Sequence, residues 1–254
     1  MASLSNLVRM SEFRFKRFSV VNERSAMKVN TDGVLLGAAM TIRPAARRLL
    51  DVGTGTGTIA LMAAQRMKDS VADEPVEIDA IDIDEASAVE AGRNFANSQW
   101  ADLFHAHQAS LEEFDAHLGH EVKYDHIFSN PPYFEDSLKA PDQRRSDSRH
   151  TSTGLSYREL LEFAKTRLSP YGHVSIVLPA DVEKDLTRYA RMCGFHLFRI
   201  LRIRTVPRKQ PGRIVAEFSF SRCADPAEGL LTIQEEGRYT QEYLALTRDF
   251  YLFA

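Results

Sequence analysis

The chain alternates between two patterns of apolar residues along most of its length. Short apolar runs of strand length are separated by segments in which apolar residues recur every three or four positions, as on one face of a helix. These patterns predict strands over residues 49–52, 77–82, 103–108, 124–129 and 172–178, and helices over residues 58–67, 85–97, 111–117, 156–168 and 181–193. Strands that alternate with helices predict a parallel sheet with helices on both faces.

The first 45 residues follow a different pattern. Phe alternates with Arg or Lys over residues 13–18, which predicts a strand with one apolar face. An apolar helix is expected over residues 31–40, with Thr31 or Asp32 as its N-cap. We interpret residues 1–45 as a basic arm and a helix that precede the alternating region.

Two long apolar runs, over residues 195–205 and 213–221, follow the last of these helices. A turn rich in Pro and Arg separates them, so we expect a hairpin in which one strand is antiparallel to the rest of the sheet. The whole pattern predicts an α/β fold with one domain over residues 1–254. Its core would be a doubly wound, Rossmann-like, mostly parallel sheet of seven strands that ends in an antiparallel hairpin strand.

Composition and charge exclude several classes of protein. The chain has 254 residues and a formal net charge of -3, so a nucleic acid would have to bind a local basic patch. Its two cysteines, Cys193 and Cys223, have neither metal-ligand nor disulfide spacing. Residues 1–10 lack the apolar core of a signal peptide, and no apolar run reaches the roughly 18 residues of a membrane span. We expect a cytoplasmic monomer that binds neither metal nor membrane.

A glycine-rich loop follows the first strand of the alternating region. After Asp51, the residues Gly53, Gly55 and Gly57 occupy every second position, and glycine lets a backbone turn tightly and approach a ligand closely. The helix that begins next adds unpaired N–H groups and the positive end of its dipole. A dinucleotide-binding fingerprint would place its third glycine at Thr58, so the spacing favours S-adenosylmethionine as the cofactor.

Asp82, at the end of the second strand, is a candidate ligand for the ribose of this cofactor. A carboxylate at that strand end can accept hydrogen bonds from both ribose hydroxyls. Asp84 is the weaker candidate because it could cap the next helix. The structural alternative for the whole region is a glycine-rich turn followed by two surface acids.

The residues Asn130, Pro131, Pro132 and Tyr133 follow the fourth expected strand. The amide oxygen of Asn130 and the backbone carbonyl of Pro131 can accept the two N–H groups of an exocyclic amine, which favours a more tetrahedral nitrogen. Two prolines hold the turn in one shape and lower the entropy cost of alignment. Tyr133 can stack on a planar base, which contributes about 1–3 kcal/mol. The structural alternative is a rigid polar turn at a sheet edge.

Five stretches, at residues 13–18, 26–37, 51–57, 130–134 and 149–151, resemble class I S-adenosylmethionine-dependent methyltransferases and, more narrowly, the bacterial tRNA adenine-N6 methyltransferases. The resemblance implies that Asn130 and Tyr133 bind the target base. One position departs from the family, because Ser110 stands where an Asp usually contacts the adenine amine of the cofactor. The cofactor site implied by the resemblance otherwise comprises Lys28, Thr31, Asp32, Asp51, Gly53, Gly55, Gly57 and Asp82.

Three groups of basic residues could contact the phosphates of a tRNA. Ion pairs within the protein are the alternative for each of them. We expect the group next to the Asn-Pro-Pro-Tyr segment to be the main RNA contact. The first group is Arg14, Lys16 and Arg17, the second is Arg144, Arg145 and Arg149, and the third is Arg202, Arg204, Arg208, Lys209 and Arg213.

Together, these features predict an enzyme that transfers a methyl group from S-adenosylmethionine to N6 of an adenine in a tRNA anticodon loop. The target base would be splayed out of its stack toward Tyr133. A protein glutamine N5-methyltransferase is an alternative, because a planar amide resembles the amine edge of a base. A ribosomal RNA guanine N2-methyltransferase and an inactive RNA-binding module of the same fold are further alternatives.

Overall fold

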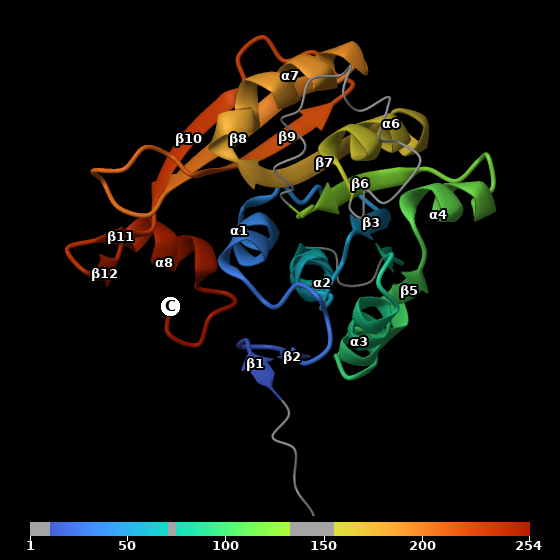
Figure 1. Ribbon diagram of the computed structural model, residues 1–254, viewed down its shortest axis with the longest axis horizontal. Helices are drawn as coiled ribbons and strands as arrows, with labels where there is room; N and C mark the ends of the chain where they lie inside the picture. The colour runs from blue at the N-terminus through green and yellow to red at the C-terminus, as the bar shows by residue number, and fades with distance from the viewer. Residues whose placement is uncertain (1–10, 71–74, 133–154) are drawn as a thin grey trace, which may run out of the picture.

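The computed structural model describes residues 11–70, 75–132 and 155–254, and a large sheet forms its centre (Figure 1). In chain order, its strands are β3 (Arg48–Val52), β4 (Glu77–Asp82), β5 (Phe104–Gln108), β6 (Tyr124–Ser129), β7 (Leu168–Pro179), β8 (His196–Arg204), β9 (Arg213–Ser219) and β10 (Ala227–Thr232). Their spatial order is β10-β8-β9-β7-β6-β3-β4-β5. The order reverses between β3 and β6, and ligands of doubly wound folds bind at such a switch point, outside the carboxyl ends of the strands.

Helices cover both faces of this sheet, as the sequence predicts (Figure 1). Each face has its own apolar core: Leu36 and Leu61 are fully buried in one, and Leu160 and Leu186 in the other. None of the helices within the described ranges is long and apolar enough to cross a membrane. The first face carries α1 (Thr31–Ala39), α2 (Thr58–Ser70) and α3 (Glu85–Ala96), and the second carries α4 (Leu111–His117), α6 (Tyr157–Arg167) and α7 (Glu183–Met192), with short 3-10 helices at Ala101–Leu103 and Ala180–Val182.

The C-terminal strands confirm the expected hairpin and add one strand to it. β9 pairs antiparallel with both β7 and β8. β10 pairs in parallel with β8 and brings the sheet to eight strands in the part of the chain that the structure describes, one more than the sequence predicts. Leu231 is the one buried residue of this edge strand, and Gly229 has no side chain to bury. The sequence of β10 therefore lacks the alternation of apolar and polar residues that would predict a strand.

The N-terminal arm is a small hairpin, and the expected single strand over residues 13–18 is wrong. β1 (Glu12–Arg14) and β2 (Ser19–Val21) pair antiparallel, and the chain turns between them. The ring of Phe15 stacks on Phe18 and on Tyr251, with centroid separations of 4.5 and 5.9 Å. The phenylalanines therefore pack on one another and on the C-terminal segment, which contains β11 (Gln234–Glu235), β12 (Arg238–Tyr239) and α8 (Gln241–Thr247).

Two helix caps lie close to the expected site. Asn30 caps α1, because its side-chain oxygen accepts the N–H of the third helical residue at 2.8 Å, so the expected cap at Thr31 or Asp32 is wrong by one or two positions. Thr31 and Asp32 instead form the first turn of the helix. Asp84 caps α3 by accepting the N–H of Ser87 at 2.9 Å, the role considered for it above.

Candidate cofactor and catalytic site

The loops that leave β3 and β6 start side by side. Val52 and Ser129 are paired at the ends of these parallel strands, and the Ser129 hydroxyl donates to the Val52 carbonyl at 2.7 Å. The next residues are Gly53 and Asn130, so both loops open at the same edge of the sheet. β3 and β6 are also the two neighbouring strands between which the strand order reverses. The structure therefore brings together the two motifs that the sequence singles out.

The three glycines of the first loop have backbone conformations that other residues rarely adopt. Their φ values are 72° at Gly53, 57° at Gly55 and 79° at Gly57. A Cβ atom at Gly57 would lie 2.5 Å from the ring of Phe95, so this glycine is required for packing against α3. At Gly53 and Gly55, a Cβ atom would meet nothing closer than 3.5 Å. These two positions leave room beside the backbone, as a cofactor loop requires.

Asp82 joins the glycine loop to the end of β4. One carboxylate oxygen accepts the N–H of Gly55 at 2.9 Å, and the other accepts the N–H of Asp84 at 2.9 Å. Burial raises the pKa of Asp82, while these two backbone hydrogen bonds act to lower it. A carboxylate has about four lone-pair sites, so acceptor capacity remains for hydroxyl donors. This geometry fits the expected ribose contact.

Asp51 is a fully buried carboxyl group beneath the same loop. The Thr54 hydroxyl donates to one of its oxygens at 2.8 Å, and the other oxygen makes no well-formed hydrogen bond with any residue that the structure describes. Burial raises the pKa of Asp51 to about 7, and the bond from Thr54 opposes that rise. The backbone N–H of Ala60 also acts to lower the pKa of Asp51. A buried carboxyl group favours a nearby positive charge. S-adenosylmethionine, with its sulfonium and ammonium groups, fits this requirement.

Asn130 is 5% exposed and lies against the segment that leads into α1. Its amide nitrogen is 3.5 Å from both the Met27 sulfur and the Asn30 side-chain oxygen, and the contact with the oxygen is at the outer limit of a hydrogen bond. The backbone of Met27 also borders Gly55 in the glycine loop. One short segment therefore touches both motifs. Both of these contacts use the amide nitrogen of Asn130 and not its amide oxygen.

Buried polar residues of α3, which the sequence analysis does not identify, hold this lead-in segment in place. Glu90 accepts the backbone N–H groups of residues 23–25 at distances between 2.7 and 3.1 Å. The Asn94 side chain bonds both backbone groups of Val21 and donates to the carbonyl of Thr56 in the glycine loop at 2.9 Å. Two polar residues four positions apart, on the apolar face of an Ala-rich helix, are the signal that could have found them.

The residues expected to flank the methionine end of the cofactor lie at the start of α1. Lys28 and Thr31 are exposed, and Asp32 is partly buried. The Asp32 carboxylate accepts a hydrogen bond from the Arg213 side chain at 2.8 Å, and the two residues form an ion pair. Arg213, from the third basic group, therefore connects the start of β9 to this helix end.

Ser110 is the N-cap of α4. Its hydroxyl accepts the Glu113 N–H at 3.2 Å, and the Glu113 carboxylate accepts the Ser110 backbone N–H at 2.9 Å, which forms a capping box. The Ser110 hydroxyl also donates to that carboxylate at 2.8 Å. The N–H of Ala109 donates to the Asp82 carbonyl at 3.0 Å, so Ser110 lies at the same edge of the sheet as the glycine loop. A hydroxyl has two lone pairs, and one remains for a donor such as the cofactor's adenine amine.

The basic residues of the arm each have a partner within the protein. Arg14 and Arg17 form ion pairs with nearby carboxylates at 3.1 and 2.5 Å, and Lys16 donates to the Ala254 carbonyl at 2.8 Å. All three residues are exposed. Ion pairs at exposed positions are weak, so these side chains can exchange their partners for phosphate groups.

The structure places Pro131 and Pro132 directly after Asn130, with Pro131 buried and Pro132 partly buried. Within the described ranges, no group of three or more His, Cys, Asp or Glu side chains is arranged to hold a metal ion. Four residues of the expected site lie outside those ranges: Tyr133, Arg144, Arg145 and Arg149.

Comparison with known proteins identifies the family. The family model of the methyltransferase small domain matches residues 24–186. The chain is 43% identical over 242 residues to a tRNA1(Val) (adenine(37)-N6)-methyltransferase of Parabacteroides distasonis, and the alignment covers 94% of this chain and 97% of that protein. A protein of the same name from Erwinia tasmaniensis is 38% identical over 257 residues, with 100% of both chains covered.

Solved methyltransferase structures share the fold at low sequence identity. A predicted O-methyltransferase from Agrobacterium tumefaciens has a TM-score of 0.60 at 18% identity, over 86% of this chain and 96% of that one. A 16S rRNA N2 methyltransferase of T. thermophilus, solved with AdoMet and guanosine, has a TM-score of 0.55 at 19% identity, over 84% of this chain and 50% of that one. The expected fold is confirmed, and the chain belongs to the methyltransferase small domain family of S-adenosylmethionine-dependent methyltransferases, in the group of the tRNA1(Val) (adenine(37)-N6)-methyltransferases.

Proposed function

We propose that this protein methylates N6 of adenine 37 in tRNA1(Val), with S-adenosylmethionine as the methyl donor. The observation that carries the proposal is the position of Asn130. It starts the loop next to Gly53, and it contacts the Met27 segment that also borders Gly55. Relatives with this name align over nearly the whole chain, and the alignment with the Erwinia tasmaniensis protein covers 100% of it, including the arm and the C-terminal segment. A tRNA substrate would place the reaction in the cytoplasm.

The site would make a weakly nucleophilic amine reactive. When bound, S-adenosylmethionine supplies an electrophilic methyl group, whose bond to sulfur breaks with both electrons left on sulfur. The lone pair of the adenine N6 is delocalised into the ring. Hydrogen bonds from its two N–H groups to the Asn130 amide oxygen and the Pro131 carbonyl would favour a tetrahedral nitrogen and align its lone pair. The methylated nitrogen is acidic and would release its proton to water, so no general base is required.

The cofactor would lie along the carboxyl edge of the sheet. Asp82 would accept the ribose hydroxyls, and Asp51 would place negative charge beneath the glycine loop. Residues 28–32 would flank the methionine end, and Ser110 would accept a bond from the adenine amine of the cofactor. Tyr133 would stack on the target base. Each of these assignments is supported by the residue type and, for all but Tyr133, by the position described above.

The test is methyl transfer from labelled S-adenosylmethionine to separate acceptors: an unmodified tRNA1(Val) transcript, ribosomal RNA and a release factor. We expect label in the tRNA alone, recovered as N6-methyladenosine after nucleoside digestion. The matched control is the same transcript with inosine at position 37, which lacks the amino group and should stay unlabelled. Label in N2-methylguanosine or in glutamine would contradict the proposal. Failure to bind S-adenosylmethionine in calorimetry would instead favour an inactive RNA-binding module.

A further inference from the structure

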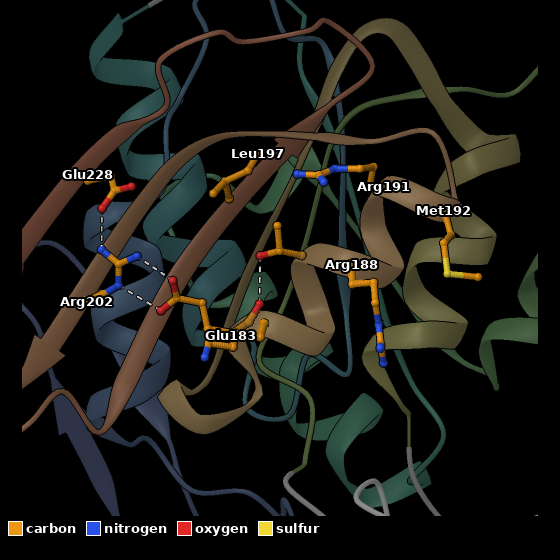
Figure 2. Close-up of a pocket in the computed structure, with 9 residues that line it drawn as sticks. Glu183, Arg188, Arg191, Met192, Leu197, Arg202 and Glu228 are labelled. Carbon is orange, nitrogen blue, oxygen red and sulfur yellow. Dashed lines mark hydrogen bonds and ion pairs between the residues drawn. The ribbon is translucent and has the colours of Figure 1, made fainter. Parts of the chain in front are cut away.

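A groove lies between α7 and the sheet edge formed by β8 and β10 (Figure 2). Its cavity volume is about 530 Å³. Basic side chains outnumber acidic ones along it, in a chain whose formal net charge is -3. A local excess of positive charge in an otherwise acidic molecule favours a polyanionic partner. The charged residues that line the groove are Lys184, Arg188, Arg191, Arg202, Glu183 and Glu228.

Arg202 forms ion pairs with both carboxylates of the groove. Its guanidinium donates to Glu183 at 2.5 and 2.9 Å and to Glu228 at 2.7 Å, as Figure 2 shows. The hydrogen bond to Glu183 is the main reason that the pKa of Arg202 is raised, so the side chain stays charged. This group ties the first turn of α7 to β8 and β10. Within the described ranges, the other basic residues of the groove form no ion pair with either of these two glutamates.

Those other basic residues form a stripe along α7. Lys184, Arg188 and Arg191 are related by i, i+4 and i+7 spacing, so they lie on one face of the helix and span about 10 Å along its axis. All three are exposed. Arg188 pairs with Asp185 at 2.9 Å, but both side chains are more than half exposed, so the pair is weak. Lys184 and Arg191 form no ion pair with any residue in the described ranges.

The stripe starts at the edge of the sheet that carries the proposed site. β7 is parallel to β6, so both strands end at the edge where Asn130 begins its loop. Only the 3-10 turn Ala180–Val182 separates the end of β7 from α7. Lys184 is therefore near that edge, and Arg191 lies farther back along the side of the molecule. A polymer whose target base entered at Asn130 could continue along this row of charges.

We propose that this groove binds the phosphate backbone of the RNA substrate, with Lys184, Arg188 and Arg191 as the countercharges. The inference rests on the proposed tRNA methylation and assigns an RNA contact outside the basic arm and the residues after the Asn-Pro-Pro-Tyr segment. Phosphate contacts of this kind position a nucleic acid without reading its sequence. They should act on the affinity for tRNA and leave the chemical step unchanged.

The test compares two double variants that each remove two positive charges. Lys184→Ala/Arg191→Ala acts in the groove. The matched control, Lys123→Ala/Lys165→Ala, acts just before β6 and in the last turn of α6, at the opposite edge of the sheet. We expect the groove variant to raise the KM for tRNA1(Val) about tenfold. Because two phosphate contacts are lost, the negative slope of log affinity against log salt should become shallower by about 1.5. Its kcat and its Kd for S-adenosylmethionine should match those of the wild type, as should all values for the control.

Three outcomes would overturn the groove proposal. One is an unchanged KM and salt slope in the groove variant, and another is an equal change in the control. The third is a lower kcat at unchanged KM, which would indicate a structural role for the stripe. Thermal unfolding of both variants checks that each is folded. A wild-type protein that neither binds nor methylates any tRNA would contradict the proposed function itself, which separates that failure from failure of the groove.

Discussion

The chain segments that precede and follow α1 are both held by a buried glutamate, but the partners of the two glutamates differ. Before α1, the partners of Glu90 within the described ranges are backbone N–H groups, those of residues 23–25. After α1, Glu217 accepts the N–H and hydroxyl of Thr41 at 2.7 and 2.9 Å, and it pairs with Arg199 at 2.6 Å. Both glutamates are almost completely inaccessible to solvent.

The difference separates two tasks. Glu90 holds the segment that contacts Asn130 and borders the glycine loop, so a change there reaches the proposed site through Met27. Glu217 belongs to a buried polar cluster that includes His126 and His173, whose rings stack with centroids 3.9 Å apart. That cluster lies at the far end of α1. We therefore expect the first region to control cofactor affinity and the second to control stability.

The largest expected effect is the loss of the cation beside Glu217. Arg199→Met would leave a buried carboxylate without its ion-pair partner, which should lower the free energy of unfolding by about 3–5 kcal/mol. Urea denaturation measures this loss, and Arg238→Met, at an exposed position of β12, is the control. At a low temperature at which the variant is still folded, it should bind S-adenosylmethionine with wild-type affinity. A loss below about 1 kcal/mol would show that the ion pair does not hold this end of α1.

Acid should weaken the same region next most strongly. Burial lowers the pKa of His126 far below its usual range and lowers the pKa of His173 to about 4. In the unfolded chain, both histidines take up protons near the ordinary histidine pKa of about 6.5. Because the folded protein takes up these protons only at lower pH, the free energy of unfolding should fall as the pH drops from about 6.5 toward 4. The shift at His173 alone corresponds to about 3 kcal/mol. Urea denaturation across this range should show a weaker pH dependence in His173→Gln; equal slopes in both proteins would contradict the account.

On the other side of α1, Glu90→Gln should weaken both cofactor binding and folding. The amide keeps one acceptor oxygen but replaces the other with a donor that faces backbone N–H groups. We expect the Kd for S-adenosylmethionine to rise about tenfold and the free energy of unfolding to fall by about 1–2 kcal/mol. Calorimetry and urea denaturation measure the two quantities. Glu85→Gln, on an exposed position of the same helix, is the matched control, and destabilisation without any change in Kd would remove the distinction between the two ends.

The smallest expected effect is a pH dependence of cofactor binding. The pKa of Asp51 is raised to about 7 by burial, and a positively charged ligand favours its ionised form. The affinity for S-adenosylmethionine should therefore increase as the pH rises through about 7, by up to about tenfold. The ammonium group of the cofactor titrates alike in both proteins, so the difference between the wild type and Asp51→Asn isolates Asp51. Identical pH profiles of the affinity in the two proteins would show that the charge of Asp51 does not contribute to cofactor binding.

Much of the fold and the centre of the site could be predicted because local physics determines them. Apolar runs marked the strands of the alternating region, and a parallel sheet brings their carboxyl ends to one edge. Gly53 and Asn130 each follow such a strand, and the structure shows that these two strands are neighbours. The helix expected over residues 156–168 begins with a capping box at Ser156, and the helix expected over residues 181–193 is followed by Gly194, whose φ is 89°.

The features that could not be predicted depend on contacts between distant segments. β10 has one buried side chain and forms because the edge of β8 is available to it. The roles of Glu90 and Asn94 depend on a backbone segment about 65–75 residues earlier in the chain, as the bonds from Ser25 and Val21 show. The sequence groups Arg202 and Arg213 with the basic residues that could contact RNA. In the structure, both form ion pairs with carboxylates that are distant in the sequence and that the fold brings next to them.

The most direct test of the central claim is to measure cofactor binding and methyl transfer separately in Asn130→Ala. If the glycine loop and the Asn130 turn form one site with divided roles, the Kd for S-adenosylmethionine should stay within about twofold of the wild type, while single-turnover methylation of tRNA1(Val) should slow by at least about 100-fold. A variant that transfers the methyl group at the wild-type rate would contradict the claim.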